Sequence, residues 1–176
     1  MRTIPEKKTL DIEFKSDFKC YPDHDLIEEI IGMSNTAGGF LFLGVEDVGM
    51  ITGVHKKHKD SIGVMALIAN STVPPISVRA EIITEENLDV LKIEVPRSRG
   101  VVSTASGKIL RRRLKFDGSP EVIPMYSYEI PSRLAELGML DYSAQPLAGA
   151  TLDDLERGLL YMEDPGRIIQ SLQAEM

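Results

Sequence analysis

The sequence contains one cysteine, Cys20, and no Cys-x-x-Cys pair. A single cysteine excludes an intrachain disulfide, and the three histidines lack the spacing of a structural zinc site. No apolar run approaches the roughly 20 residues that a membrane-spanning helix requires. The opening segment MRTIPEKKTLD holds no apolar signal region. We therefore expect a cytoplasmic protein with no membrane partner.

The net charge of −7 argues at first against a nucleic-acid partner, but the charge is unevenly distributed. Residues 1–115 hold 17 basic and 16 acidic side chains, whereas residues 116–176 hold 3 and 11. Five basic residues lie within eight positions that contain no acid: Lys108, Arg111, Arg112, Arg113 and Lys115. Phosphate binding depends on such a local field and not on the total charge.

The segment 34–54, SNTAGGFLFLGVEDVGMITGV, is the most informative part of the chain. Its glycines allow a left-handed turn at the end of a helix, and residues 40–45 form an apolar run of strand length. Residues 46–49 make an acidic turn, and residues 50–54 are predicted to run back as a partner strand. Glu46 and Asp47 are thereby placed at the open end of a buried strand, where recognition or chemistry is often found.

The remaining pattern predicts an α/β (α+β) fold with a mixed β-sheet, in which β-hairpins pack against two helices. Alternation of apolar and charged residues predicts a strand over 9–15. Apolar residues at helical spacing predict helices over 25–36 and 60–72. Two hairpins are predicted, one from 76–83 and 89–95, the other from 101–103 and 108–115. Asp25 and Glu28 have the spacing of a capping box, and the Asn35 amide is expected to cap the helix end. His55 and His58 are expected to face solvent.

The chain changes character after residue 124, where it becomes acidic and short amphipathic helices are predicted over 128–137, 151–162 and 165–176. We therefore expect a domain over 1–125 and an acidic helical extension over 126–176. The apolar stripe of the last helices packs back on the domain or, alternatively, forms a homo-oligomer contact.

In its order of motifs the chain resembles the Schlafen-type Alba-like (AlbA_2) domain. The motifs are EFK at 13–15, NTAGGFLFLGVED at 35–47, and a basic strand after residue 107. The resemblance covers roughly residues 8–125. It implies a DNA-binding domain of the kind found in bacterial transcriptional regulators, which has also been called a divergent AAA domain.

The first hypothesis is therefore a nucleic-acid-binding domain, with DNA as partner and no enzymatic activity or cofactor. Lysine and arginine neutralise phosphates and displace counterions. On a strand, Arg111 and Arg113 share one face while Arg112 takes the other. The candidate nucleic-acid-binding residues are Lys15, Lys108, Arg111, Arg113 and Lys115.

The second hypothesis is a metal-dependent endoribonuclease, because some Schlafen proteins cut structured RNA with three carboxylates that hold Mg²⁺ or Mn²⁺. The resemblance carries this role onto Glu13 and onto Glu46 or Asp47. The position of the first glutamate is occupied by Lys8, which cannot bind a cation.

The third hypothesis is ATP binding, which the AAA label suggests. A phosphate-binding loop needs a glycine-rich turn followed by lysine and then serine or threonine. Gly39 and Gly44 have the right interval, but Val45 and Glu46 stand where those side chains belong.

Overall fold

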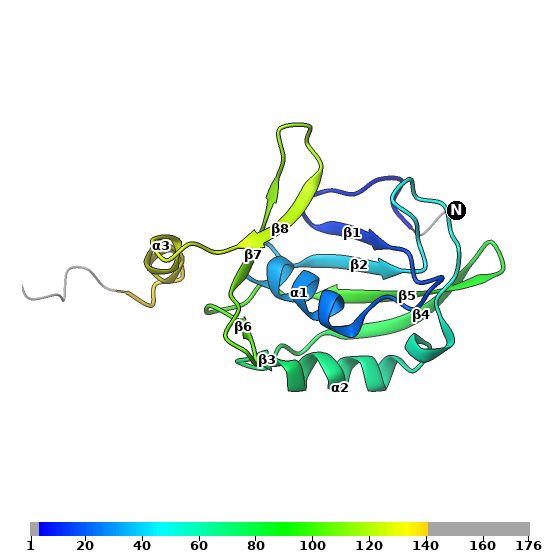
Figure 1. Ribbon diagram of the computed structural model, residues 1–176, viewed down its shortest axis with the longest axis horizontal. Helices are drawn as coiled ribbons and strands as arrows, with labels where there is room; N and C mark the ends of the chain where they lie inside the picture. The colour runs from blue at the N-terminus through cyan, green and yellow to red at the C-terminus, as the bar shows by residue number, and fades with distance from the viewer. Residues whose placement is uncertain (1–3, 141–176) are drawn as a thin grey trace, which may run out of the picture. The chain divides into compact units, whose positions relative to one another are not determined.

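The structure, a computed structural model, describes residues 4–140. Its central sheet holds four strands, β1 (Ile12–Lys15), β2 (Gly39–Leu43), β4 (Arg79–Glu85) and β5 (Leu88–Val95). They lie in the order β1-β2-β5-β4 (Figure 1). The β1–β2 pair is parallel, and the other two pairs are antiparallel. The sheet is therefore mixed, as the sequence predicted.

Two helices, α1 (Asp23–Ser34) and α2 (Ser61–Ser71), cover one face of this sheet. Their apolar side chains form one buried cluster with alternate residues of β2 and β5, including Leu41, Leu91 and Ile93. Asp60 caps α2, because its side chain accepts a hydrogen bond from the Gly63 N–H at 3.1 Å. A short 3₁₀ turn, η1 (Lys56–His58), precedes it.

The opposite face of the sheet carries a smaller cluster that contains Phe14, Phe42 and Val90. The rings of Phe14 and Phe42 meet edge to face, with centroids 5.9 Å apart. Since neighbouring strand residues point to opposite faces, Glu13 and Lys15 of β1 lie on the face that α1 covers. The alternation of apolar and polar residues in β1 is typical of a strand with one face in solvent, but β1 places the acidic side chain of Glu13 inside the protein.

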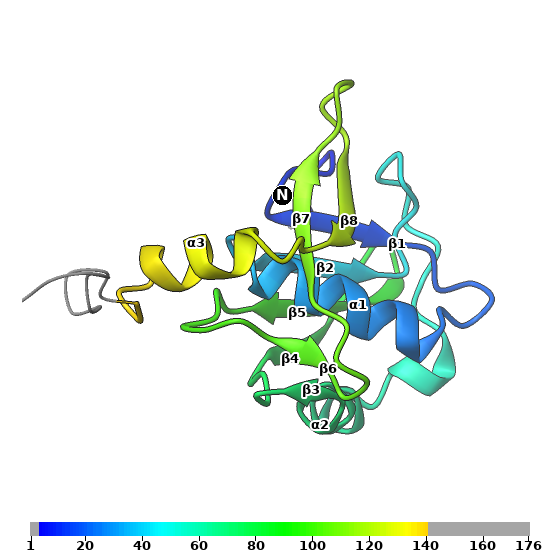
Figure 2. The same ribbon diagram turned by 60° about the vertical axis from the view of Figure 1, so that its left-hand side comes forward.

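Two small sheets lie outside the central one. Strand β3 (Thr72–Val73) pairs with β6 (Ser103–Thr104), and β7 (Leu110–Leu114) pairs with β8 (Pro120–Pro124). The predicted hairpin between 101–103 and 108–115 is confirmed only near its turn, where Ser103 forms an antiparallel bridge with Ile109 and the Thr104 N–H donates to the Lys108 carbonyl. The partner of β7 comes from the residues after the turn at Gly118, and the β7–β8 hairpin projects from the body (Figure 2).

Glycines in the central block let backbones approach closely. A Cβ on Gly39 or on Gly44 would overlap the backbone of Asp11 or of Gly53, respectively. Both glycines have positive φ. The predicted strand over 50–54 is reduced to a bridge between Val45 and Ile51. The reason is that the Thr52 and Gly53 N–H groups both turn back onto the Gly44 carbonyl.

The capping of α1 differs from the prediction at both ends. The helix begins at Asp23 and no side chain caps it, so Asp25 lies within the first turn. The Asn35 amide does not cap the other end. It is buried, donates to the Val102 and Leu110 carbonyls at 2.8 Å, and accepts from the Val102 N–H. Asn35 therefore connects α1 to the segments on either side of β6.

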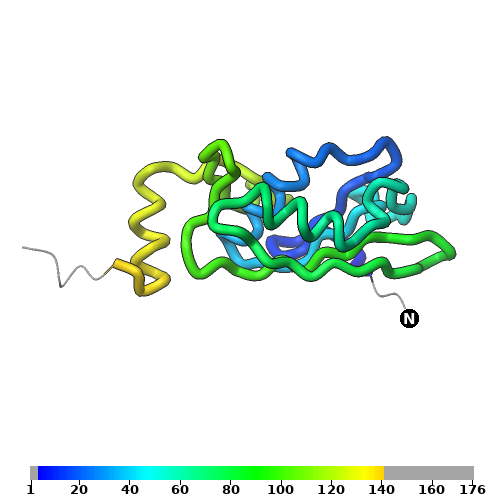
Figure 3. Tube along the Cα trace, turned by 90° about the horizontal axis from the view of Figure 1, so that it is seen from below, coloured from blue at the N-terminus to red at the C-terminus, as the bar shows by residue number. Residues whose placement is uncertain are grey.

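Helix α3 (Glu129–Glu136) follows β8 and matches the predicted helix over 128–137. It lies at the end of the body away from the β4–β5 turn (Figure 3). One compact unit extends to Leu140, while the expected boundary near residue 125 stays a prediction. The helices predicted over 151–162 and 165–176 lie outside the described residues. Within residues 4–140, no helix has the length and apolar character to cross a membrane.

Candidate nucleic-acid interface

The β7 arginines alternate between the two sides of their strand. Arg112 is 2% exposed, whereas Arg113 is exposed and Arg111 lies between these extremes. Nη2 of Arg112 lies 2.6 Å from Oε2 of Glu13 and also donates to the carbonyls of Thr9 and Ile12. The central arginine of the cluster therefore ties β7 to β1, on the side of the strand opposite to Arg113, as strand alternation predicted.

Glu13 is the acceptor for several donors at once. Its Oε1 accepts from the Phe14 N–H at 3.0 Å and from Nζ of Lys8 at 2.6 Å, while Oε2 accepts from Arg112. The residue is 3% exposed. A buried carboxylate with cations on both oxygens is compensated, as an interior charge must be.

Lys8 forms ion pairs with two of the three carboxylates that were candidates for metal binding. Its Nζ lies 2.6 Å from Glu13 and 2.6 Å from Oδ1 of Asp47. Glu46 accepts a hydrogen bond from the Thr52 hydroxyl at 2.8 Å. The ammonium group thus stands between two of the three carboxylates, and these residues do not fit a Mg²⁺ or Mn²⁺ site. In the described part of the chain, no group of three His, Cys, Asp or Glu residues has metal-binding geometry.

Four of the five predicted nucleic-acid-binding residues form ion pairs. Lys15 pairs with Glu29, Lys108 with Glu28, Arg111 with Glu129 and Arg113 with Glu121, at 2.6 to 2.7 Å. The side chains of Lys108 and Arg113 are about half exposed, whereas those of Lys15 and Arg111 are 21% and 24% exposed. Lys115 is exposed, and no salt bridge joins it to the described residues.

These ion pairs differ in how readily a phosphate could replace the carboxylate. An exposed pair such as Arg113–Glu121 contributes only about 0–1 kcal/mol and exchanges easily. The Arg111–Glu129 pair is more enclosed. Burial alone would raise the pKa of Glu129, but hydrogen bonds from Arg111 and from the Tyr126 N–H lower it below its usual range. Arg113, Lys115 and Lys108 are therefore the available cations of the set.

The tip of the β7–β8 hairpin also presents apolar side chains to solvent. Phe116 is fully exposed and Leu114 is 51% exposed, on either side of Lys115. Asp117 holds the turn by accepting from the Ser119 N–H and hydroxyl. Sequence reasoning missed Phe116. The signal that could have found it is an aromatic residue between a lysine and an Asp-Gly turn, directly after the arginines.

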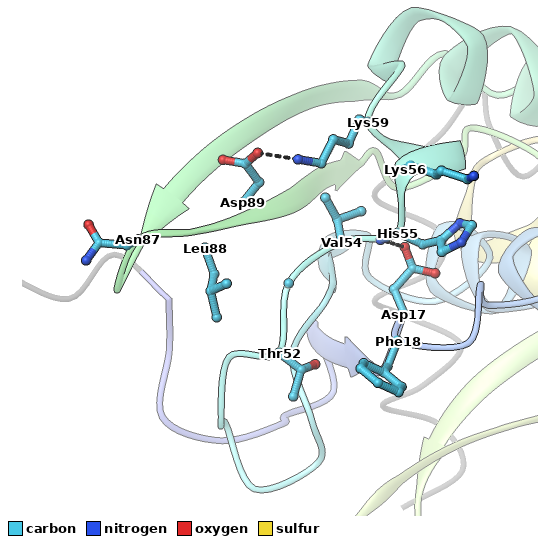
Figure 4. Close-up of a pocket in the computed structure, with 11 residues that line it drawn as sticks. Asp17, Phe18, Thr52, Val54, His55, Lys56, Lys59, Asn87, Leu88 and Asp89 are labelled. Atoms are coloured by element: carbon cyan, nitrogen blue, oxygen red, sulfur yellow. Dashed lines mark hydrogen bonds and ion pairs between the residues drawn. The ribbon is translucent and has the colours of Figure 1, made fainter.

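A second basic region lies in the segment 55–59, where the structure corrects the prediction for His58. That residue is 1% exposed, and its Nδ1 lies 2.9 Å from Oδ2 of the buried Asp17. Asp17 also accepts from the His55 N–H (Figure 4). A cavity of about 420 Å³ adjoins this loop, with Lys56, Lys59 and Phe18 in its lining. Of the lysines in this lining, Lys59 is paired with Asp89 at 2.7 Å.

Residues 8–115 of the chain match the Schlafen AlbA_2 family. The chain therefore belongs to that family, and the resemblance noted in the sequence is confirmed. Among curated proteins no match is found.

Two solved structures are similar to this chain. The DIP2311 protein from Corynebacterium diphtheriae has a TM-score of 0.60 and 21% identity, over 89% of this chain and 30% of that one. The N-terminal domain of a RecG-related protein from Nitrosomonas europaea has a TM-score of 0.44 and 19% identity, over 52% and 65%. The first likeness confirms the α+β fold. This chain spans less than a third of the length of the DIP2311 protein.

Proposed function

We propose that this chain is the nucleic-acid-binding domain of a transcriptional regulator and that it binds DNA through the β7–β8 hairpin. The observation that carries the proposal is the hairpin tip, where Arg113, Lys115 and Phe116 are exposed together on a projecting two-stranded ribbon. Membership of the AlbA_2 family supports the same class of partner.

Different side chains of the hairpin would make different kinds of contact with DNA. Cations on the exposed side neutralise backbone phosphates, with Lys108 as a further contact near its base. A two-stranded ribbon fits the width of the major groove of B-DNA. The Phe116 ring offers an apolar surface to a base or a sugar. Arg112 and Lys15 hold the framework, and Arg111 holds α3 through Glu129.

The test is fluorescence anisotropy with a labelled generic duplex at low salt. The double variant Arg113→Glu plus Lys115→Glu is expected to weaken binding strongly, because it reverses two phosphate contacts. The matched control is Lys19→Glu plus Lys56→Glu, which makes the same change in net charge at two exposed lysines outside the hairpin. Equal losses in both variants, or no binding by the unchanged chain, would contradict the proposal.

A further inference from the structure

Four arginines from separate parts of the chain line one cavity beside the base of the β7–β8 hairpin. Arg97 follows β5, Arg111 and Arg112 lie on β7, and Arg133 lies on α3. The cavity has a volume of about 300 Å³. Its remaining lining is Asn35, Thr36, Met125, Glu129, Ser132 and Glu136.

Three of these guanidinium groups keep N–H donors that no acceptor in the described residues satisfies. They are Nε of Arg111, Nε and Nη1 of Arg112, and Nε of Arg133, all of them buried, although Nη1 of Arg112 lies 4.0 Å from Oε2 of Glu29 outside the cavity. Arg133 is 7% exposed, and its Nη2 donates to the Ser98 carbonyl at 3.3 Å. A buried donor without an acceptor is costly, so each of these groups calls for an oxygen nearby.

The cavity lining holds fewer acidic than basic side chains, and the acidic ones already form hydrogen bonds or ion pairs with residues of the protein. Glu129 accepts from Arg111 at 2.7 Å and from the Tyr126 N–H at 2.8 Å. Glu136 is 65% exposed and lies 3.7 Å from Nη1 of Arg133. The lining holds four positive and two negative charges, and Glu13 outside the lining pairs with Arg112, so one positive charge is left without an acid. Burial and the charge of Arg97 lower the pKa of Arg133, while Glu136 acts in the opposite direction.

We propose that this cavity is a binding site for a phosphate group carried by a nucleotide or by the end of a nucleic-acid strand. Guanidinium groups bind phosphate oxygens as well as carboxylate oxygens through paired hydrogen bonds, and a tetrahedral anion presents oxygens to several elements at once. The volume is about ten times the ~30 Å³ share of one water molecule, so a phosphate and part of its sugar fit. The site is separate from the hairpin tip.

The experiment is isothermal titration of the full chain with inorganic phosphate and with adenosine 5′-monophosphate, against chloride at equal ionic strength. Arg97 is exposed, so Arg97→Gln leaves the fold intact, and Arg133→Gln provides a second variant. Each is expected to lower phosphate affinity about tenfold, the effect of losing a charged hydrogen bond. The matched control is Arg99→Gln, an exposed arginine two residues away that lines a different cavity.

Absence of phosphate binding by the unchanged chain overturns the proposal, as does an equal loss in Arg99→Gln and Arg97→Gln. The two sources of phosphate are distinguished with a short oligonucleotide that carries either a 5′-phosphate or a 5′-hydroxyl. Tighter binding of the phosphorylated strand than of the monophosphate assigns the site to a strand end, and the reverse assigns it to a free nucleotide. Arg113→Glu plus Lys115→Glu is expected to leave phosphate binding unchanged, so this site and the duplex interface can fail independently.

Discussion

Arg112 and Glu13 are 99 positions apart in the sequence and form a buried salt bridge of 2.6 Å. The pair joins the projecting hairpin to β1, the edge strand of the central sheet. Arg112 is thereby a structural contact in the middle of the basic cluster, while Arg113 is exposed on the other side of the strand.

The first prediction concerns the stability that this pair provides. Arg112→Met leaves the Glu13 carboxylate buried with Lys8 as its remaining ion-pair partner at short distance. We expect the free energy of unfolding to fall by about 3–5 kcal/mol, as when one partner of a buried pair is removed. Urea denaturation measures this, with the half-exposed Arg113→Met as control and an expected change within about 0.5 kcal/mol. Similar values for both variants would show that Arg112 is not a structural contact.

The second prediction concerns Lys8, whose ammonium group lies between Glu13 and Asp47. Lys8→Glu replaces that cation by a carboxylate and gathers hard oxygen ligands, which Mn²⁺ prefers. We expect millimolar Mn²⁺ to raise the melting temperature of Lys8→Glu and to have little effect on the unchanged chain. Differential scanning calorimetry with and without chelator decides the matter. An equal response of both proteins would mean that Lys8 does not block cation binding.

The third prediction concerns Phe116 at the hairpin tip. Because its ring is fully exposed, Phe116→Ala is expected to leave stability within about 0.5 kcal/mol of the unchanged chain. Contact between an aromatic ring and a base contributes about 1–3 kcal/mol, so DNA affinity is expected to fall about tenfold. Phe18→Ala is the matched control, an exposed phenylalanine outside the hairpin. If that variant lost as much affinity, the tip would have no special role.

The fourth prediction concerns alkaline pH. Burial, followed by the negative charges of Glu29 and Asp25, raises the pKa of Tyr21 well above its ordinary value of 10. The unfolded chain then ionises this phenol at lower pH than the folded chain. The contribution of the neutral Tyr21 side chain to the free energy of unfolding is therefore complete below pH 10 and is lost as the pH rises further. We expect Tyr21→Phe to reduce the loss of stability between about pH 10 and 11. Urea midpoints at both pH values test this, and an unchanged slope would be the contrary result.

Much of the fold follows from local patterns, because periodicity and turn chemistry act over short distances. The helix ended by Ser71 and the β4–β5 hairpin with its Glu86-Asn87 turn both match the prediction. The pairing of β7 with β8 was missed, since residues 120–124 carry two prolines, which weaken a strand pattern. His58 was misplaced for a different reason. Its burial depends on Asp17, 41 residues away, and no spacing rule connects the two.

The candidate site was predictable only in part. Strand alternation correctly predicted that Arg112 takes the opposite side of the strand from Arg113, because side-chain direction is a local property. The ion pairs of Lys15 and Arg111 depend on α1 and α3 and needed the structure. The cavity that includes Arg97 and Arg133 joins residues from four separate segments. Such a site has no linear motif.

The most direct measurement of the central claim is a nuclear magnetic resonance titration of the ¹⁵N-labelled chain with a short DNA duplex. We expect the largest changes in amide signals at residues 113–119, which form the exposed part of the hairpin. These changes should shrink as salt is added, because phosphate contacts release counterions. Changes confined to the basic segment 55–59, with residues 113–119 unaffected, would contradict the claim.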